Sequence, residues 1–207
     1  MLPLLTSAIV LLIAYSLGAI PSGYWAGKLL QNIDIREHGS GSTGATNVLR
    51  TLGRGSAIAV LLADIVKGAA AIAVARFLGS DFSLEWLTWL VTLAGLAAVL
   101  GHSRSMWLRF TGGKSAATGL GVLIAMAWPV GLGVALVFGV FLALSRIVSL
   151  SSIAAALASI GLMLFFQQPL PYVLLAAAGG LYVIARHWTN IQRLIAGTEP
   201  PIGRQLS

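Results

Sequence analysis

Long apolar runs constrain this chain more than any other feature of its sequence. Hydrophobic residues make up 57% of the chain and charged residues only 9%, whereas a soluble domain carries about 25% charged residues. A helix that crosses a bilayer needs about 20 apolar residues. Runs of roughly this length cover residues 4–29, 55–78, 84–100, 150–166 and 170–184. We therefore expect an all-α integral membrane protein, in which residues 1–207 form a single membrane domain.

Residues 116–144 allow two interpretations. They form either one helix of about 44 Å, at 1.5 Å per residue, or two short spans that turn at Trp128 and Pro129, because proline breaks helices and tryptophan favours the membrane interface. With two spans the chain crosses seven times, and one side carries the basic residues Lys28, Arg36, Arg50, Arg54, Arg104, Arg109, Lys114, Arg146, Arg186, Arg193 and Arg204. Only Arg76 lies opposite, while Lys67 lies within a span. The positive-inside rule therefore favours seven helices, with the N-terminus outside and the C-terminus in the cytoplasm.

Two glycine-rich segments match parts of nucleotide-binding motifs. Residues 39–44, Gly-Ser-Gly-Ser-Thr-Gly, fit the pattern G-x-G-x-x-G, and Gly113, Lys114 and Ser115 match the end of a P-loop. The first pattern requires a strand before it and a soluble helix after it, but a polar segment precedes it here and a membrane span follows. The P-loop requires a glycine where Leu108 stands. The sequence therefore predicts no nucleotide site.

Both segments are nevertheless suited to binding another anion. Glycine allows backbone N–H groups to approach an anion closely, the interleaved Ser, Thr and Asn residues add donors, and Arg50 and Lys114 add positive charge. In the seven-helix topology both segments lie on the cytoplasmic face, together with residues 145–149 and 186–190. We expect this face to bind more than one phosphate. The alternative is that the glycines only permit tight turns and close helix packing.

Other polar residues within or beside the apolar runs can be explained without a role in phosphate binding. Asp64 and Lys67 are three residues apart and share a helix face. We expect them to form an internal ion pair that fastens helices, because charges within a membrane are usually paired and face the interior. Alternatively, the charge of Lys67 acts on a substrate site. We interpret His38 and His102 as interfacial polarity.

His187 and Asn190 are also three residues apart, and they share one face if the last helix continues past Arg186. No carboxylate accompanies them at a spacing typical of metal ligands, so we expect hydrogen bonds to phosphate or substrate and no metal site. Nucleic-acid binding is not expected, because the aromatic residues lie mainly in or beside apolar runs. No histidine is followed four residues later by aspartate, so the sequence contains no His–Asp catalytic base at this spacing. No serine stands in a G-x-S-x-G motif, so the serine nucleophile of α/β-hydrolases is also absent.

Together these segments resemble a known bacterial family, the acyl-phosphate-dependent glycerol-3-phosphate acyltransferases, or PlsY family. The resemblance covers nearly the whole chain and is carried by residues 39–50, 64–68, 101–118, 146–150 and 186–194. Three small polar residues depart from the family pattern. Ser42 stands where many members have asparagine, Ser105 where proline is common and Ser115 where glycine is usual.

The resemblance implies a seven-helix fold in the bacterial inner membrane, with the active site on the cytoplasmic face. It implies transfer of a fatty acyl group from acyl phosphate to the sn-1 hydroxyl of glycerol 3-phosphate. The products are 1-acyl-sn-glycerol 3-phosphate and phosphate, which is the first acylation step of phospholipid synthesis. Expected partners are acyl phosphate, glycerol 3-phosphate and membrane lipid, with no cofactor and no nucleic acid, and the protein is expected to be a monomer.

An acyl phosphate is already activated, so catalysis would rest on positioning and on neutralising the departing phosphate. We assign catalytic roles to Arg50, Lys114, Ser149, His187 and Asn190. Substrate-binding roles go to Ser40, Gly41, Gly44, Thr46, Asn47, Gly112 and Gly113. Two rival classes are a transporter for an anionic solute, which predicts broken helices and repeat symmetry, and a non-catalytic membrane subunit.

Overall fold

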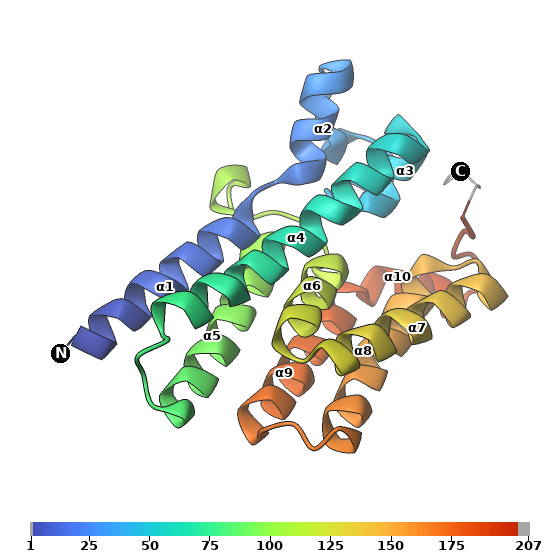
Figure 1. Cartoon of the computed structure of the whole chain (residues 1–207). Helices are drawn as coiled ribbons and strands as arrows, with labels where there is room; N and C mark the ends of the chain where they lie inside the picture. The colour runs from blue at the N-terminus through green and yellow to red at the C-terminus, as the bar shows by residue number, and fades with distance from the viewer. Residues whose placement is uncertain (1, 203–207) are drawn as a thin grey trace.

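The computed structural model describes residues 2–202, and Figure 1 shows the arrangement of its helices. Arg204, which the charge argument included, lies outside these residues. Within them the chain consists of helices, loops and one isolated β-bridge between Ser105 and Thr111. The expected all-α architecture is therefore confirmed. The elements are α1 (Leu2–Ala19), α2 (Ser22–Gln31), η1 (Ile35–Glu37), α3 (Ala45–Leu52), α4 (Arg54–Leu78), α5 (Leu84–Ser103), η2 (Met106–Leu108), α6 (Ala116–Met126), α7 (Trp128–Ser145), α8 (Val148–Phe165), α9 (Leu170–Arg186) and α10 (Trp188–Ile195).

Five helical segments of the described chain are long and apolar enough to cross a membrane: Pro3–Gln31, Arg54–Leu78, Leu84–Ser103, Trp128–Ser145 and Val148–Phe165. A sixth results if α9 and α10, which are bent by 62° relative to each other, count as one broken span. The remaining apolar helix, α6, is shorter. The protein is thus a multi-pass membrane protein, and the seventh span stays a prediction that depends on α6.

The first expected helix, over residues 4–29, is interrupted between α1 and α2. Ile20 and Pro21 lie outside helical geometry, with Pro21 at φ −90° and ψ 69°. The span expected there is confirmed as a candidate span, Pro3–Gln31. It is not one unbroken helix, because proline lacks an N–H group and disfavours the helical conformation of the residue before it. The break redirects the chain so that α2 projects from the end of α1 (Figure 1).

The expected break near Trp128 and Pro129 is confirmed. Helix α6 ends at Met126, and Ala127 leaves helical geometry with φ −147° and ψ 84°. Pro129 lies in the first turn of α7, where a missing N–H group costs no hydrogen bond. Arg76 of α4 donates a hydrogen bond of 2.9 Å to the carbonyl of Met126. This contact satisfies one of the free carbonyls at the end of α6.

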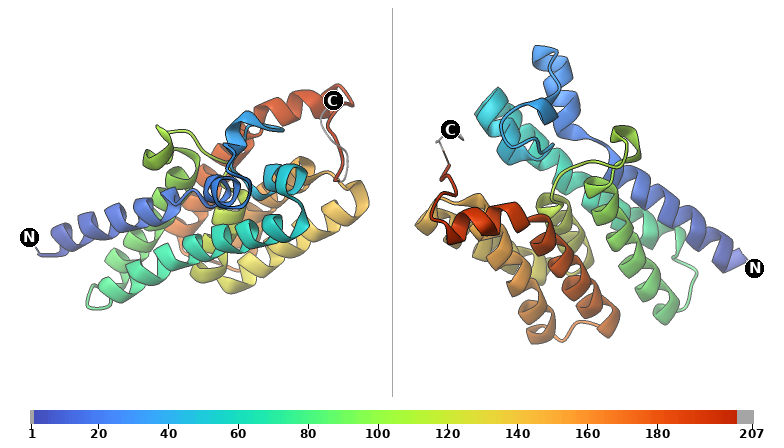
Figure 2. Two further views of the ribbon diagram at one scale, coloured as in Figure 1. Left: turned by 90° about the horizontal axis from the view of Figure 1, so that it is seen from above. Right: turned by 180° about the vertical axis from the view of Figure 1, so that it is seen from behind.

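Glycines allow neighbouring helices to approach closely. Helix α1 packs against α4 and α5, α4 packs against α6, and α8 packs between α7 and α9 (Figures 1 and 2). A Cβ atom at Gly68 of α4 would overlap the carbonyl of Thr118 in α6, and a Cβ atom at Gly121 would overlap the carbonyl of Ile65. Small residues are typical of helix contacts in membranes, where dispersion forces and close packing drive association.

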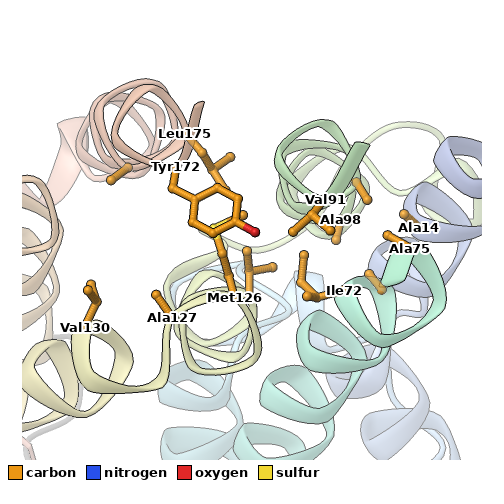
Figure 3. Packing of buried hydrophobic residues seen from close by; sticks show 14 of the residues in the cluster. Ala14, Ile72, Ala75, Val91, Ala98, Met126, Ala127, Val130, Tyr172 and Leu175 are labelled. Carbon is orange, nitrogen blue, oxygen red and sulfur yellow. The ribbon is translucent and has the colours of Figure 1, made fainter. Parts of the chain in front are cut away.

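A buried apolar cluster holds the helices together around α6. Tyr172 and Leu175 of α9 lie near Met126 of α6, and Ile72 of α4 and Val91 of α5 belong to the same cluster (Figure 3). Since α6 contacts α4, α5 and α7, its position is fixed on several sides. The N-terminal end of α6, which follows the second glycine-rich segment, is therefore held at a defined place.

Candidate active site

A cavity of about 300 Å³ lies where α3, α6, α8, α9 and α10 converge. Its polar part, called the mouth below, is lined by residues at helix ends and in the two glycine-rich segments. From there the lining continues along the apolar faces of α6, α7, α8 and α9, which form the groove. Residues lining the groove include Leu123, Ala135, Phe138, Ala155, Leu175 and Val183. One cavity therefore joins a polar mouth to an apolar groove.

Most of the predicted site residues meet at this cavity. Those that line it are Ser40, Gly44, Thr46, Asn47, Arg50, Lys114, Ser149, His187 and Asn190. Gly41 and Gly112 line a neighbouring pocket, which shares Ser40, Ser42 and Lys114 with the main cavity. Gly113 lines neither pocket and packs against the ring of His102.

Asn47 fixes the shape of the first glycine-rich segment. Its buried side chain accepts a hydrogen bond of 2.8 Å from the backbone N–H of Ser40. Its amide nitrogen lies 2.9–3.0 Å from the carbonyls of Ile35, His38 and Ser42, to which it donates. All of the polar atoms of this side chain are thereby used inside the protein. Asn47 thus orders the segment around the mouth.

The second glycine-rich segment is held by backbone contacts. The N–H of Gly113 donates to the carbonyl of His102 at 3.2 Å. The Gly113 carbonyl accepts from Ser103 at 3.1 Å and from the Arg186 guanidinium at 3.2 Å. With Gly113 fixed on both sides, the following residue, Lys114, reaches the mouth from a rigid segment.

Two of the departures from the family pattern have a visible structural basis. Ser115 has φ 64°, in the left-handed region that favours glycine, and its hydroxyl donates to the Val99 carbonyl at 2.7 Å. Ser105, where proline is common, donates a hydrogen bond of 2.6 Å to the carbonyl of Ala19. That carbonyl belongs to the last residue of α1, so Ser105 satisfies a helix end created by the break at Pro21.

A carboxylate that the sequence did not single out, Glu199, lies at the mouth. It is only 8% exposed and borders the cavity. One oxygen accepts hydrogen bonds from Ser149 at 2.8 Å and from the Asn190 amide at 2.5 Å. The other accepts from Arg193 at 2.6 Å. Glu199 therefore orients two predicted catalytic residues. The sequence feature that could have indicated Glu199 is that it is the one acidic residue among the basic residues that follow Arg186.

The mouth carries net positive charge, because Glu199 is surrounded there by Arg50, Lys114, Arg186 and Arg193. Burial lowers the pKa of Lys114 to about 8, because the attraction of Glu199 only partly offsets the lost hydration and nearby arginines add repulsion. Burial also lowers the pKa of Arg50, although an arginine stays protonated in proteins. Burial opposes the ionisation of Glu199, but hydrogen bonds from Asn190, Arg193 and Ser149 outweigh it and hold its pKa below the ordinary value. A bound anion would raise the pKa of Lys114 again, because it stabilises the charged ammonium.

Asp64 and Lys67 form a buried ion pair of 2.8 Å, as expected. Asp64 also accepts a hydrogen bond of 3.0 Å from Ser22, and Lys67 donates to the Ile20 carbonyl at 2.8 Å. The pair therefore fastens the break between α1 and α2 to α4. The interpretation of His102 as interfacial polarity is wrong, since His102 is 7% exposed, lines the cavity and lies 3.6 Å from Asp64.

His187 and Asn190 reach the mouth by a different path from the one expected. The last helix does not continue straight past Arg186 but bends at His187, by 62°. Both side chains are nevertheless buried and line the cavity. A ring nitrogen of His187 lies 2.8 Å from the Val183 carbonyl, which fixes the orientation of the ring.

Within residues 2–202, no group of three or more His, Cys, Asp or Glu side chains is placed to hold a metal ion. The donors at the mouth are instead cations, hydroxyls and amides, which are suited to phosphate oxygens. The apolar groove that continues from them is suited to a hydrocarbon chain. The arrangement can therefore bind an amphiphile with an anionic head.

Comparisons with known proteins identify the family. A family model described as glycerol-3-phosphate acyltransferase matches residues 8–197. The glycerol-3-phosphate acyltransferase 2 of Rhizobium johnstonii is 61% identical over 97% of both chains, and the Nostoc sp. enzyme is 58% identical over 95% of this chain and 92% of its own. A crystal structure of PlsY, an integral membrane glycerol 3-phosphate acyltransferase, in its glycerol 3-phosphate form, has a TM-score of 0.88 at 36% identity and covers 95% of this chain and 96% of its own.

Proposed function

Because the chain belongs to the glycerol-3-phosphate acyltransferase family, we propose that it transfers a fatty acyl group from acyl phosphate to the sn-1 hydroxyl of glycerol 3-phosphate. The products are 1-acyl-sn-glycerol 3-phosphate, also called lysophosphatidate, and inorganic phosphate. The observation that carries this proposal is the single cavity that joins a cationic mouth to an apolar groove. Both substrates carry a phosphate for the mouth, and one carries an acyl chain for the groove.

In the proposed reaction, the hydroxyl oxygen of glycerol 3-phosphate attacks the acyl carbonyl carbon. The bond from this carbon to the phosphate oxygen breaks, and the departing phosphate takes up the hydroxyl proton. Lys114 and Arg50 neutralise phosphate charge, and backbone and hydroxyl donors around Ser40 and Thr46 orient the two phosphates. The walls of the mouth are completed by Ser149, His187 and Asn190. Positioning and electrostatic stabilisation are the main sources of rate in such a site.

We also propose a seven-span topology in the bacterial inner membrane, with a cytoplasmic active site. One span consists of α1 and α2 together, and another consists of α9 and α10 together. The other five spans are the single helices α4, α5, α6, α7 and α8. The positive-inside rule supports this orientation, since the basic residues Lys28, Arg50, Arg104, Lys114 and Arg146 then face the cytoplasm. Residues 1–207 form one domain, and because the cavity is lined within a single chain, a monomer suffices for activity.

A donor comparison tests the proposed function. The protein, purified into lipid nanodiscs, is given glycerol 3-phosphate with either hexadecanoyl phosphate or hexadecanoyl-coenzyme A. We expect lysophosphatidate from the acyl phosphate alone. Equal or greater formation from the coenzyme A ester would contradict the proposed donor, while leaving the family assignment intact.

A further inference from the structure

Two glycines of the groove face open space. Gly119 of α6 and Gly179 of α9 both line the cavity, and a Cβ atom built at either would meet no heavy atom within 4 Å. Their neighbour Gly180 differs, because a Cβ atom there would lie 3.1 Å from the carbonyl of Ala156 in α8. Gly180 therefore serves the close packing of α8 and α9. Helix packing does not require a glycine at 119 or 179.

The two glycines lie at different depths. At 1.5 Å per residue, Gly179 lies about 12 Å along α9 from His187 at the mouth, and Gly119 lies about 5 Å along α6 from its first residue. The groove lining continues past Gly179 to Ala176 and Leu175 on the same helix. A chain that extends along α9 from the mouth to the far part of the groove therefore passes Gly179.

We propose that Gly179 determines which acyl chains the enzyme accepts, while Gly119 keeps the groove open near the mouth for every chain. Without side chains at these positions, the groove stays wide enough for a long acyl chain to extend from the mouth to the far part of the groove. A side chain at Gly179 would occupy that path and leave room only for short chains. This inference rests on the proposed function, since it takes the acyl chain of the donor as the occupant of the groove.

The test measures chain-length preference in the variants Gly179→Ala, Gly179→Val and Gly179→Leu. The ratio of kcat/KM for hexadecanoyl phosphate to kcat/KM for octanoyl phosphate is expected to fall progressively, by about tenfold or more in Gly179→Leu, because one excess methylene in a pocket already changes discrimination about tenfold or more. Gly119→Leu is expected to reduce the rate with both donors, because Gly119 lies nearer the mouth.

Matched controls are Gly139→Leu on α7 and Gly161→Leu on α8. A Cβ atom at either also meets nothing within 4 Å, but neither residue lines the cavity. Both controls should keep the wild-type ratio. An unchanged ratio in the Gly179 series, or the same change in the controls, would overturn the inference.

A binding measurement separates this inference from the proposed function. The ratio of Kd for octyl phosphate to Kd for hexadecyl phosphate needs no turnover and should fall in Gly179→Leu. If the wild-type enzyme does not turn over any acyl phosphate, the proposed donor is wrong, yet a changed binding ratio would still support the assignment of Gly179. If turnover is normal and neither ratio changes, only the inference fails.

Discussion

The ammonium group of Lys114 donates a hydrogen bond of 2.5 Å to the side-chain oxygen of Asn190. The amide of Asn190 is in turn held by Glu199. Lys114, which belongs to the second glycine-rich segment, is thereby aligned by Asn190 after the bend between α9 and α10 and by Glu199 of the C-terminal segment. In the proposed reaction, a substrate phosphate that enters the mouth would meet this oriented cation.

Replacement of Lys114 should reduce activity strongly. We expect Lys114→Ala to lower kcat/KM for glycerol 3-phosphate by about tenfold to a hundredfold, because a hydrogen bond to a charged group contributes about 1.5–3 kcal/mol. Steady-state kinetics on purified protein measures this change. Lys28→Ala, which removes an exposed lysine of α2 outside the cavity, is the control and should keep wild-type activity. Wild-type activity in Lys114→Ala would refute the assignment.

The rate should decline at alkaline pH. The pKa of Lys114 is about 8 in the free protein, so the ammonium is charged below this pH and loses its proton above it. We expect kcat/KM to fall with a slope of about one log unit per pH unit above about pH 8, since kcat/KM reports the free enzyme. In Lys114→Arg any residual activity should lack this decline, because arginine stays charged. The same decline in that variant would assign it to another group.

Glu199 should contribute to stability through the hydrogen bonds that it accepts. Glu199→Ala leaves the buried donors of Ser149 and Asn190, and the half-buried donor of Arg193, without their acceptor, so the free energy of unfolding should fall by about 1–3 kcal/mol. Glu199→Gln should be less destabilised because it keeps an acceptor oxygen. Thermal unfolding in detergent compares the variants with the wild type.

The acid dependence of stability provides a check on Glu199. Its pKa in the folded protein lies below the ordinary 4.5. The stability that its ionisation contributes is therefore complete above pH 4.5 and is lost as the pH falls through the folded-state pKa. Glu199→Gln should lack this part of the acid-induced loss. An identical acid profile would show that the carboxylate is not held as described.

Even small changes to the side chain of Asn47 should reduce activity and stability. Asn47→Ala removes the anchor of the first glycine-rich segment, and Asn47→Asp keeps an acceptor for the Ser40 N–H but cannot donate to the three carbonyls. Both variants should lose activity about tenfold or more and unfold at lower temperature. Asn32→Gly, at an exposed position with φ 54° that glycine accepts readily, should behave like the wild type. Full activity of Asn47→Asp would contradict this role.

A methyl group at Gly113 should disturb the site. Its Cβ atom would overlap the Nε2 atom of His102, which forces either the ring or the segment carrying Lys114 to move. Since displacements of about 1 Å cost up to a hundredfold in rate, we expect Gly113→Ala to lower kcat by about tenfold or more. Gly55→Ala is the matched control, because a Cβ atom there meets nothing within 4 Å. Equal kinetics for the two variants would argue against the packing described.

The sequence predicted the parts of the site that local patterns encode. Arg50 and Lys114 were selected as candidates because they lie beside or within a glycine-rich segment, and His187 and Asn190 because they stand at helical spacing. The structure places all four at the cavity. The helix break at Ala127 was found because proline and tryptophan mark it. These sequence signals are local, so they can be recognised without knowledge of the tertiary structure.

Residues that act through tertiary contacts were missed. Glu199 contacts Ser149 across fifty residues of sequence, and nothing local marks it as buried. His102 stands at the end of an apolar run, where interfacial polarity is the simplest interpretation, and only the packing of α4 and α5 shows it beside Asp64. The break at Pro21 was missed because the apolar pattern continues across it.

The central claim is direct acyl transfer between two phosphate-bearing substrates at one cavity, and a two-product time course tests it most directly. Purified protein is incubated with hexadecanoyl phosphate and glycerol 3-phosphate, and inorganic phosphate and lysophosphatidate are measured in the same samples. We expect the two products to form at equal rates and neither to form enzymatically when glycerol 3-phosphate is omitted. Phosphate release without lysophosphatidate, or no turnover with this donor, would contradict the account.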